Sequence, residues 1–413
     1  MRVENQLNEP ANKQPNEPVN EPVNEPANEQ PQRAPGRDGQ RPEHWHISLF
    51  LLLPLSAVLL SLLFLLFYRP PEREASTFSQ EAGRLRLQLR DGEAGRYFAL
   101  GEHRLLHVDA LSCSILNMAG VELQRYPIPM NDPMVLREGP STLVFDLNGT
   151  TYIVLNEQGR LYQGSTSDRI KGATVAADGR SALILDRAES LGSVLVLDRS
   201  GEKILEWIAR DRRQSGYPIK LHFNASAPLL DVSLYNTERD RGRSLVQSLR
   251  LDADSPGEVA DSFTAEQVGA LTYLDRRADG SLYMASDRYL LYRDAQAKVV
   301  SFPFNQIIQA IPQGDGVVLL GERETGSGWG LYYWTGEEGR ITRLGERRYT
   351  EDSRLYAVER ERFAVRAGQQ ILCFEGPRTA PSASYAFETP IHRAYREGRS
   401  LIVITEDSLE RLR

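Results

Sequence analysis

Cysteine is scarce in this chain, with only Cys113 and Cys373 among 413 residues. Two thiols 260 positions apart cannot build a disulfide framework or a local metal-binding knuckle, because both need closely spaced cysteines. Each lies in a strand-like context, SCSIL and QILCF, so we interpret both as small buried side chains. A long-range disulfide stays open as an alternative if the parts of the fold that carry them are neighbours.

Catalytic and ligand-binding motifs are also missing. The sequence contains no His-Glu-x-x-His, phosphate-binding loop, Gly-x-Ser-x-Gly or calcium-loop pattern. His103 and His107 lie four apart in a strand pattern, which separates their α-carbons by roughly 13 Å, too far to share one metal ion easily. His222 and His392 are isolated and are interpreted as structural. We therefore assign no catalytic, cofactor-binding or metal-binding residue and expect no cofactor.

The chain has no block of basic residues, and its formal net charge is −7. Nucleic acid is therefore not expected as a partner, because phosphate binding needs clustered positive charge. Nothing in the sequence identifies a small-molecule ligand.

Long hydrophobic runs are absent except for one, residues 47–68, which contains no charged side chain. As a helix its 22 residues would reach roughly 33 Å, enough to cross a hydrocarbon core of about 30 Å. The 46 residues before it are too many for the leader of a cleaved signal, so we predict a transmembrane helix that binds the lipid bilayer. Three arginines precede and two follow it within 15 residues, which favours a cytoplasmic N-terminus and an extracytoplasmic C-terminal domain at the cytoplasmic membrane.

Residues 1–46 form a tail rich in Asn, Glu and Pro, with an Asn-Glu-Pro-Val repeat. Proline every fourth residue forbids a regular helix, and little apolar surface is present to bury, so we predict disorder. The tail is interpreted as a solvating spacer, with a docking segment for a cytoplasmic partner as the alternative. Residues 69–82 are predicted to be a linker, and residues 83–413 one domain.

From about Leu85 onward, short strand-like runs alternate with Gly, Asp and Asn turns, and no amphipathic helix is evident. Three turns share one pattern, in which an apolar strand is followed by Asn or Asp, two variable residues and Gly. Their glycines, Gly120, Gly159 and Gly201, are 39 and 42 residues apart. A four-strand unit of about 40 residues is typical of a β-propeller blade, so we predict an all-β propeller.

We predict eight four-stranded blades, with approximate bounds 96–129, 130–167, 168–212, 215–264, 267–304, 306–348, 350–388 and 390–413. The last has room for three strands, and the alternating segment 84–90 can supply the fourth and close the ring. Seven blades stay an alternative, because the fourth unit is irregular around residues 236–243.

The segment from Asp198 to Trp207, a turn with Gly followed by a strand bearing Trp, resembles a blade of the pyrroloquinoline-quinone (PQQ) enzymes and their non-enzymatic relatives. Those enzymes dock their blades with repeated tryptophans and hold cofactor and calcium in a central funnel. Here the pattern occurs once among four tryptophans. The resemblance therefore implies a PQQ-like or WD40-like propeller of the kind that binds proteins.

The order of parts also resembles a bacterial family of unknown function with single-pass, membrane-anchored, propeller-like domains. The similar segments are Asp132-Pro133-Met134-Val135, residues 143–149 (LVFDLNG), Ile170-Lys171-Gly172-Ala173 and Tyr217-Pro218. The resemblance implies a cell-envelope location and no known reaction.

Three functions agree with these observations. The favoured one is a non-catalytic protein-binding or scaffold module of the cell envelope. The alternatives are an extracytoplasmic propeller enzyme (hydrolase, lyase or quinoprotein-like oxidoreductase) and a sensor that signals through the tail. A candidate partner-binding patch is the aromatic group Trp329, Tyr332, Tyr333 and Trp334, although strand alternation would bury about half of it.

Overall fold

The computed structural model divides the chain into two compact units, Met1–Arg73 and Glu74–Arg413. The residues it describes belong to the second unit: 78–81, 84–88, 96–101, 103–210, 215–237, 242–252, 254–336, 339–359, 361–397 and 400–412. No helix in these ranges is long and apolar enough to cross a membrane. The predicted tail (1–46) and transmembrane helix (47–68) lie outside the described residues.

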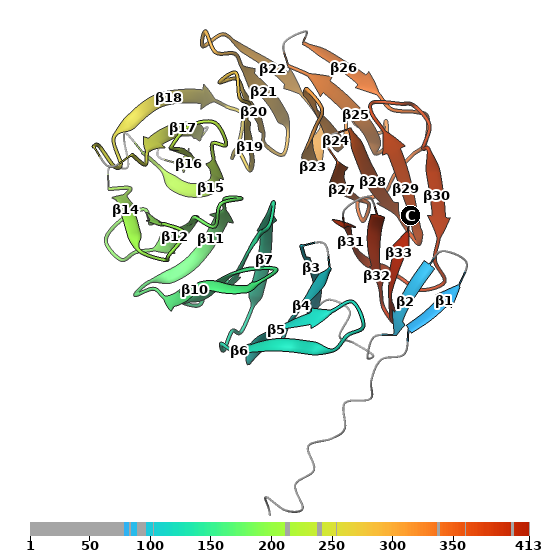
Figure 1. Ribbon diagram of the computed structural model, residues 1–413. Helices are drawn as coiled ribbons and strands as arrows, with labels where there is room; N and C mark the ends of the chain where they lie inside the picture. Colours follow the sequence, from blue (N-terminus) through green and yellow to red (C-terminus); the bar gives the residue numbers. More distant parts are fainter. Residues whose placement is uncertain are drawn as a thin grey trace, which may run out of the picture. The chain divides into compact units, whose positions relative to one another are not determined.

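Figure 1 shows the second unit as a closed ring of eight antiparallel sheets, so the predicted eight-bladed, all-β propeller is confirmed and the seven-bladed alternative is wrong. We number the blades 1 to 8 along the chain. Blade 1 contains β3 (Tyr97–Leu100), β4 (Arg104–Val108), β5 (Ser112–Asn117) and β6 (Glu122–Pro127). Blade 2 contains β7 (Pro133–Glu138), β8 (Ser141–Asp146), β9 (Thr151–Asn156) and β10 (Gly159–Ser165). Blade 3 contains β11 (Arg169–Val175), β12 (Ser181–Asp186), β13 (Ser193–Leu197) and β14 (Lys203–Ile208).

The next four blades follow the same plan, with the first strand innermost and the fourth outermost. Blade 4 contains β15 (Tyr217–Phe223), β16 (Leu229–Asn236), β17 (Arg243–Arg250) and β18 (Val259–Glu266). Blade 5 contains β19 (Tyr273–Arg276), β20 (Leu282–Ala285), β21 (Tyr289–Arg293) and β22 (Val299–Pro303). Blade 6 contains β23 (Gln306–Gln313), β24 (Gly316–Glu322), β25 (Gly330–Thr335) and β26 (Arg340–Arg343). Blade 7 contains β27 (Arg354–Glu359), β28 (Arg362–Ala367), β29 (Gln370–Glu375) and β30 (Ala383–Ala386).

Blade 8 joins the two ends of the described chain. Its sheet has the order β1 (Phe78–Glu81), β2 (Arg84–Gln88), β33 (Ser408–Leu412), β32 (Ser400–Thr405) and β31 (Ile391–Glu397). Pairing of β2 with β33 confirms the predicted ring closure by the segment 84–90. However, β1 lies within residues 69–82, which the sequence pattern assigned to the linker. Four residues of mixed polarity are too few to give a periodic signal, so the start of the sheet was placed too late.

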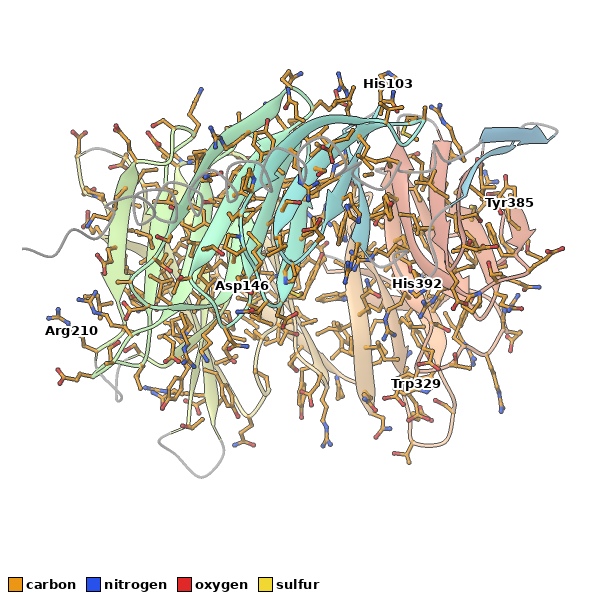
Figure 2. The ribbon with its side chains drawn as sticks, turned by 90° about the horizontal axis from the view of Figure 1, so that it is seen from below. His103, Asp146, Arg210, Trp329, Tyr385 and His392 are labelled. Atoms are coloured by element: carbon orange, nitrogen blue, oxygen red, sulfur yellow. The ribbon has the colours of Figure 1, made fainter. Side chains whose placement is uncertain are left out.

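The blades have two ends, which define two faces of the ring. We call the face where the innermost strands begin the entry face; it also carries the turns between second and third strands. Hydrogen bonds support this grouping, because the Asn148 N–H donates to the Ile170 carbonyl and the Ile170 N–H donates to the Gly149 carbonyl, each at 2.8 Å. In Figure 2, Trp329 and Arg210 lie on this side of the ring and His103 lies on the opposite side, which we call the exit face.

The predicted turn chemistry is present. The Asn117 side-chain oxygen accepts hydrogen bonds from the N–H groups of Ala119 and Val121, and Gly120 has a φ of +75°. Asp198 does the same for Ser200 and Glu202. A short polar side chain that bonds its own backbone, followed by a glycine at positive φ, closes these hairpins at little steric cost.

Candidate functional site

The predicted aromatic group is divided between the core and the surface. Tyr332 and Trp334 have exposed fractions of 3% and 1%, whereas Trp329 and Tyr333 are half-buried. Trp334 makes edge-on contacts with rings of blade 5, with centroids 5.2 Å from Tyr283, 6.4 Å from Tyr292 and 5.9 Å from Phe302. Half of the group therefore fills the seam between blades 5 and 6, as alternation predicts. A partner-binding role for Trp329 and Tyr333 stays a prediction.

The two cysteines and the two histidines of blade 1 do not form a metal site in the described part of the chain. Cys113 is buried in blade 1 and Cys373 is half-buried in blade 7. Blade 8 lies between these blades, and both thiols are free, so the long-range disulfide does not form. Burial raises the pKa of Cys113 to about 12. The His107 ring packs 4.7 Å from its cross-strand neighbour Tyr97. Within the described residues no group of three or more His, Cys, Asp or Glu side chains could hold a metal ion.

A buried polar cluster crosses blade 4 as a transverse row. Cross-strand pairing places His222 opposite Asp231, Asp231 opposite Ser248, and Ser248 opposite Asp261. Residues directly opposite on neighbouring strands share one face of a sheet. The four side chains therefore form one row, from the innermost strand to the outermost, on the face toward blade 5.

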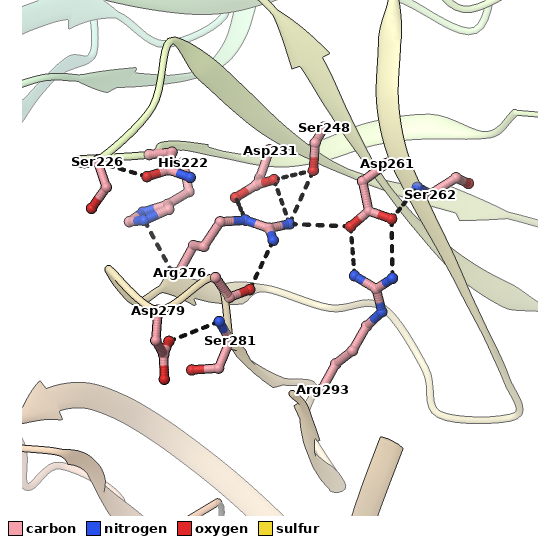
Figure 3. Close-up of polar contacts among 12 residues, drawn as sticks. His222, Ser226, Asp231, Ser248, Asp261, Ser262, Arg276, Asp279, Ser281 and Arg293 are labelled. Atoms are coloured by element: carbon pink, nitrogen blue, oxygen red, sulfur yellow. Dashed lines mark hydrogen bonds and ion pairs between the residues drawn. The ribbon is translucent and has the colours of Figure 1, made fainter. Parts of the chain in front are cut away.

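Blade 5 presents two arginines to this row, and Figure 3 shows the contacts. Arg276 binds Asp231 through two bonds, Nε to Oδ2 at 2.8 Å and Nη2 to Oδ1 at 2.9 Å, and Nη2 also donates to Ser248 Oγ at 3.0 Å. Arg293 binds both carboxylate oxygens of Asp261. The backbone N–H of Arg276 donates to His222 Nε2 at 3.3 Å. We call these contacts the 4–5 clamp, because they join all four strands of blade 4 to β19 and β21 of blade 5.

Burial and charge decide the electrostatics of the clamp. Asp231 has no exposed surface, and the Arg276 side chain is 8% exposed. Burial acts to lower the pKa of Arg276, but the hydrogen bond and charge of Asp231 outweigh it, and the net shift is upward. At Asp261 burial acts to raise the pKa, but Arg293 outweighs it, and the net shift is downward. Arg276 and Asp261 are therefore held in their ionised forms.

The clamp binds blades to each other rather than a ligand, because its carboxylates are occupied by arginines and the Asp231 carboxylate is sealed from solvent. Sequence interpretation treated His222 as isolated and missed the rest of the cluster. One signal was present, since Asp231 interrupts the apolar strand LLDVSL, and a buried charge in such a strand requires a partner. The partner, 45 residues further on, could not be identified from spacing.

A second group of residues lies on the entry face over blades 2 to 4. The buried Asp146 carboxylate accepts hydrogen bonds from the N–H groups of Asn131 and Asp132 at 2.9 and 2.7 Å. Lys171 connects blade 2 to blade 3 by donating to Asn148 at 3.1 Å and pairing with Asp186 at 3.2 Å. The segments that carried the family resemblance in blades 2 and 3 are thus bonded to one another here.

Three large apolar side chains are exposed on the same face. Met134 and Tyr217, near the starts of β7 and β15, are 40% and 47% exposed, and Leu111, in a turn of blade 1, is 70% exposed. Met134 and Tyr217 belong to the same resemblance segments. Among the described residues, the other exposed large apolar side chains lie at or beside the starts of outermost strands, on the exit face: Val121, Leu123, Leu161, Val259 and Val299. Single exposed apolar residues are ordinary, but Met134 and Tyr217 differ from these because they lie on innermost strands, near the centre of one face, as in a binding surface.

Comparison with known proteins identifies the family of this chain. A family model described as a family of unknown function, DUF5711, matches residues 76–315. The chain belongs to the DUF5711 family. The match covers β1, β2 and blades 1 to 5, and it includes all of the resemblance segments and the 4–5 clamp. The comparison with curated proteins finds no match.

Solved structures agree on the fold. BamB from Moraxella catarrhalis is 11% identical with a TM-score of 0.51, covering 82% of this chain and 100% of its own. Sqt1 from Chaetomium thermophilum, solved bound to the N-terminus of ribosomal protein L10, is 11% identical with a TM-score of 0.53, covering 78% of this chain and 98% of its own. At such identities the likeness shows a β-propeller fold and nothing finer.

Proposed function

We propose that this DUF5711 chain is a membrane-anchored propeller of the cell envelope that binds a protein partner on its entry face and has no catalytic role. The observation that carries the proposal is the exposure of Met134 and Tyr217 on one face, at the starts of two inner strands. Apolar and aromatic side chains are enriched at the centres of protein interfaces. The rigid, closed ring holds them in fixed positions, which lowers the ordering cost of binding.

The proposed location rests on the uncharged run 47–68, which has the length of a transmembrane helix. The flanking arginines favour an extracytoplasmic propeller. Sqt1, a propeller of similar fold, is described as bound to the N-terminus of another protein, which supports binding of a protein segment by such a ring. Treating intact cells with an impermeant protease tests the topology, since the propeller is expected to be accessible only from outside the cytoplasmic membrane.

Site-specific photocrosslinking tests the interface. A photoreactive residue replaces Met134 or Tyr217 in the full-length chain, and crosslinked products from cells are identified by mass spectrometry. Val299, which is 40% exposed at the start of β22 on the exit face, is the matched control for Met134. We expect one reproducible envelope protein from the entry-face positions and none from Val299. Equal products from all three positions, or none, would reject the proposed face.

An enzyme is the second candidate, and one observation favours it. Lys220, on the inner strand β15, has no hydrogen-bond or ion-pair partner among the described residues, and burial lowers its pKa. A lysine with a lowered pKa is a better nucleophile, as lyases that form Schiff bases require. Reductive trapping with borohydride and cell extract carbonyl compounds would label Lys220 if this chemistry occurs, and a Lys220→Arg chain is the control.

A further inference from the structure

His222 differs from the other acceptors of the 4–5 clamp because it accepts through a neutral nitrogen. Its Nε2 atom receives the backbone N–H of Arg276 at 3.3 Å, from the innermost strand of the next blade. A protonated imidazole has donors on both nitrogens and cannot accept this bond. Protonation would therefore turn an attraction between β15 and β19 into a contact between two donors.

We propose that His222 makes the inner end of the 4–5 seam a pH-responsive latch, closed while its imidazole is neutral and released when the imidazole is protonated. The latch concerns the ring itself and does not depend on which partner the propeller binds. Release loosens β19 from β15, while Arg276 still joins β19 to β16 and Arg293 still joins β21 to β18.

The charges around His222 come from three strands. Lys220 lies on its own strand β15, Asp231 faces it from β16, and Asp275 and Arg276 face it from β19. Lys220 and Arg276 oppose a positive charge on His222, whereas the two aspartates favour one. Arg276 already occupies Asp231 with two hydrogen bonds, so that carboxylate has limited capacity to receive a second cation.

Burial is the largest influence on His222, and it lowers its pKa below the ordinary value of 6.5. The unfolded chain therefore binds a proton at His222 more readily than the folded chain does. Stability consequently rises with pH through this window, is complete above about 6.5, and is lost as pH falls toward the folded-state pKa. Asp261, whose pKa is lowered, stays ionised in the same window and keeps Arg293 bound.

Hydrogen exchange of the full-length chain tests the latch. Amide protection, corrected for the intrinsic pH dependence of exchange, is measured in residues 273–276 at about pH 7.5 and about pH 5. In the wild-type chain we expect the amide protection factor to be about fivefold lower or more at the acidic pH, because one buried hydrogen bond is lost. His222→Gln keeps an acceptor that does not titrate, so its protection should be the same at both pH values.

His392→Gln is the matched control, since His392 is an exposed histidine on the innermost strand β31 of another blade. In this variant the amide protection of residues 273–276 should fall in acid as it does in wild type. A wild-type chain with unchanged protection, or His222→Gln with the wild-type loss, would overturn the proposal. If His222→Gln lowers overall stability, the thermal midpoint decides instead: its fall between the two pH values should be smaller in His222→Gln than in His392→Gln.

Discussion

The two seams on either side of blade 5 are built from different chemistry. The seam with blade 4 contains an apolar cluster that includes Leu271 and Met284, and beside it the 4–5 clamp, whose contacts are charged and directional. The seam with blade 6 contains an aromatic cluster around Trp334, together with buried tyrosines and aliphatic side chains. Both seams join the same four-stranded sheet to a neighbour of the same topology, so the difference lies in side-chain chemistry rather than in the backbone.

The comparison suggests that the seams have different tasks. Aromatic packing buries much apolar area, and edge-to-face contacts such as those of Trp334 add further stability. A buried ion pair contributes little net stability, because desolvation offsets its attraction, but it tolerates only one register of the two blades. We interpret the aromatic rings as the main source of stability in the 5–6 seam, and the 4–5 clamp as the feature that fixes the alignment of blades 4 and 5 and responds to pH.

The largest expected effect is at the aromatic seam. Trp334→Ala removes a fully buried ring and leaves a cavity among Tyr283, Tyr292 and Phe302, which should cost about 3–5 kcal/mol of unfolding free energy. Chemical denaturation of the full-length chain measures it. Trp329→Ala is the control, because this half-buried tryptophan should cost less. Equal losses would show that the seam does not depend on Trp334.

At the polar seam, Asp231→Asn keeps the shape of the side chain but leaves the buried Arg276 without its counter-charge. We expect the free energy of unfolding, measured by chemical denaturation, to fall by about 3 kcal/mol. The double change Asp231→Leu with Arg276→Met should restore most of it, since an apolar pair of similar volume avoids desolvation. A double variant as unstable as Asp231→Asn would indicate that the ion pair itself is a net source of stability.

The aromatic seam should be sensitive to alkali. Burial raises the pKa of Tyr283, so the folded chain holds its phenol proton more tightly than the unfolded chain. Stability is therefore complete below the ordinary pKa of 10.0 and is lost as pH rises above it. Tyr283→Phe also loses the hydrogen bond to the Asp315 carbonyl, which costs about 1–2 kcal/mol.

The check for Tyr283 is the slope of unfolding free energy between about pH 9 and pH 11. Tyr283→Phe should flatten this slope relative to wild type. An unchanged slope would mean that other groups cause the alkaline loss.

The smallest expected effect is at the outer end of the polar seam. Because the pKa of Asp261 is lowered in the folded chain, its contribution is present above about pH 3.9 and is lost as pH falls through the folded-state value. Asp261 is partly exposed, so the effect should be below about 1 kcal/mol. Asp261→Asn should remove this part of the fall in unfolding free energy at low pH, as measured by chemical denaturation. Glu258→Gln, which changes an exposed ion pair, should leave that fall intact.

The strands were predictable because their signals are local. Asn or Asp followed by Gly closes a hairpin through bonds within the turn itself, as at Asn117, and the repeat of that turn revealed the blade period. The closing strand could be inferred because blade 8 lacked one strand and the segment 84–90 alternated. The four residues of β1 escaped notice because so short a strand has no period.

The candidate sites were less predictable, because they depend on which blades become neighbours. Tyr332 and Trp334 were named for binding, together with Trp329 and Tyr333, and yet they pack against rings 28 to 51 residues earlier in the chain. His222 was interpreted as an isolated structural histidine, although it begins a row of side chains drawn from four strands. Spacing along the chain carries no information about contacts of this kind.

By itself, therefore, the sequence determined the all-β class, the blade period and the place where the ring closes, since hairpin turns and strand alternation depend on residues near one another. Only the tertiary structure decided that a charged clamp lies beside the apolar contacts between blades 4 and 5, and that aromatic rings meet between blades 5 and 6. The physical reason is that a side chain's environment at a seam is set by the facing sheet, whose register depends on ring geometry rather than on local spacing.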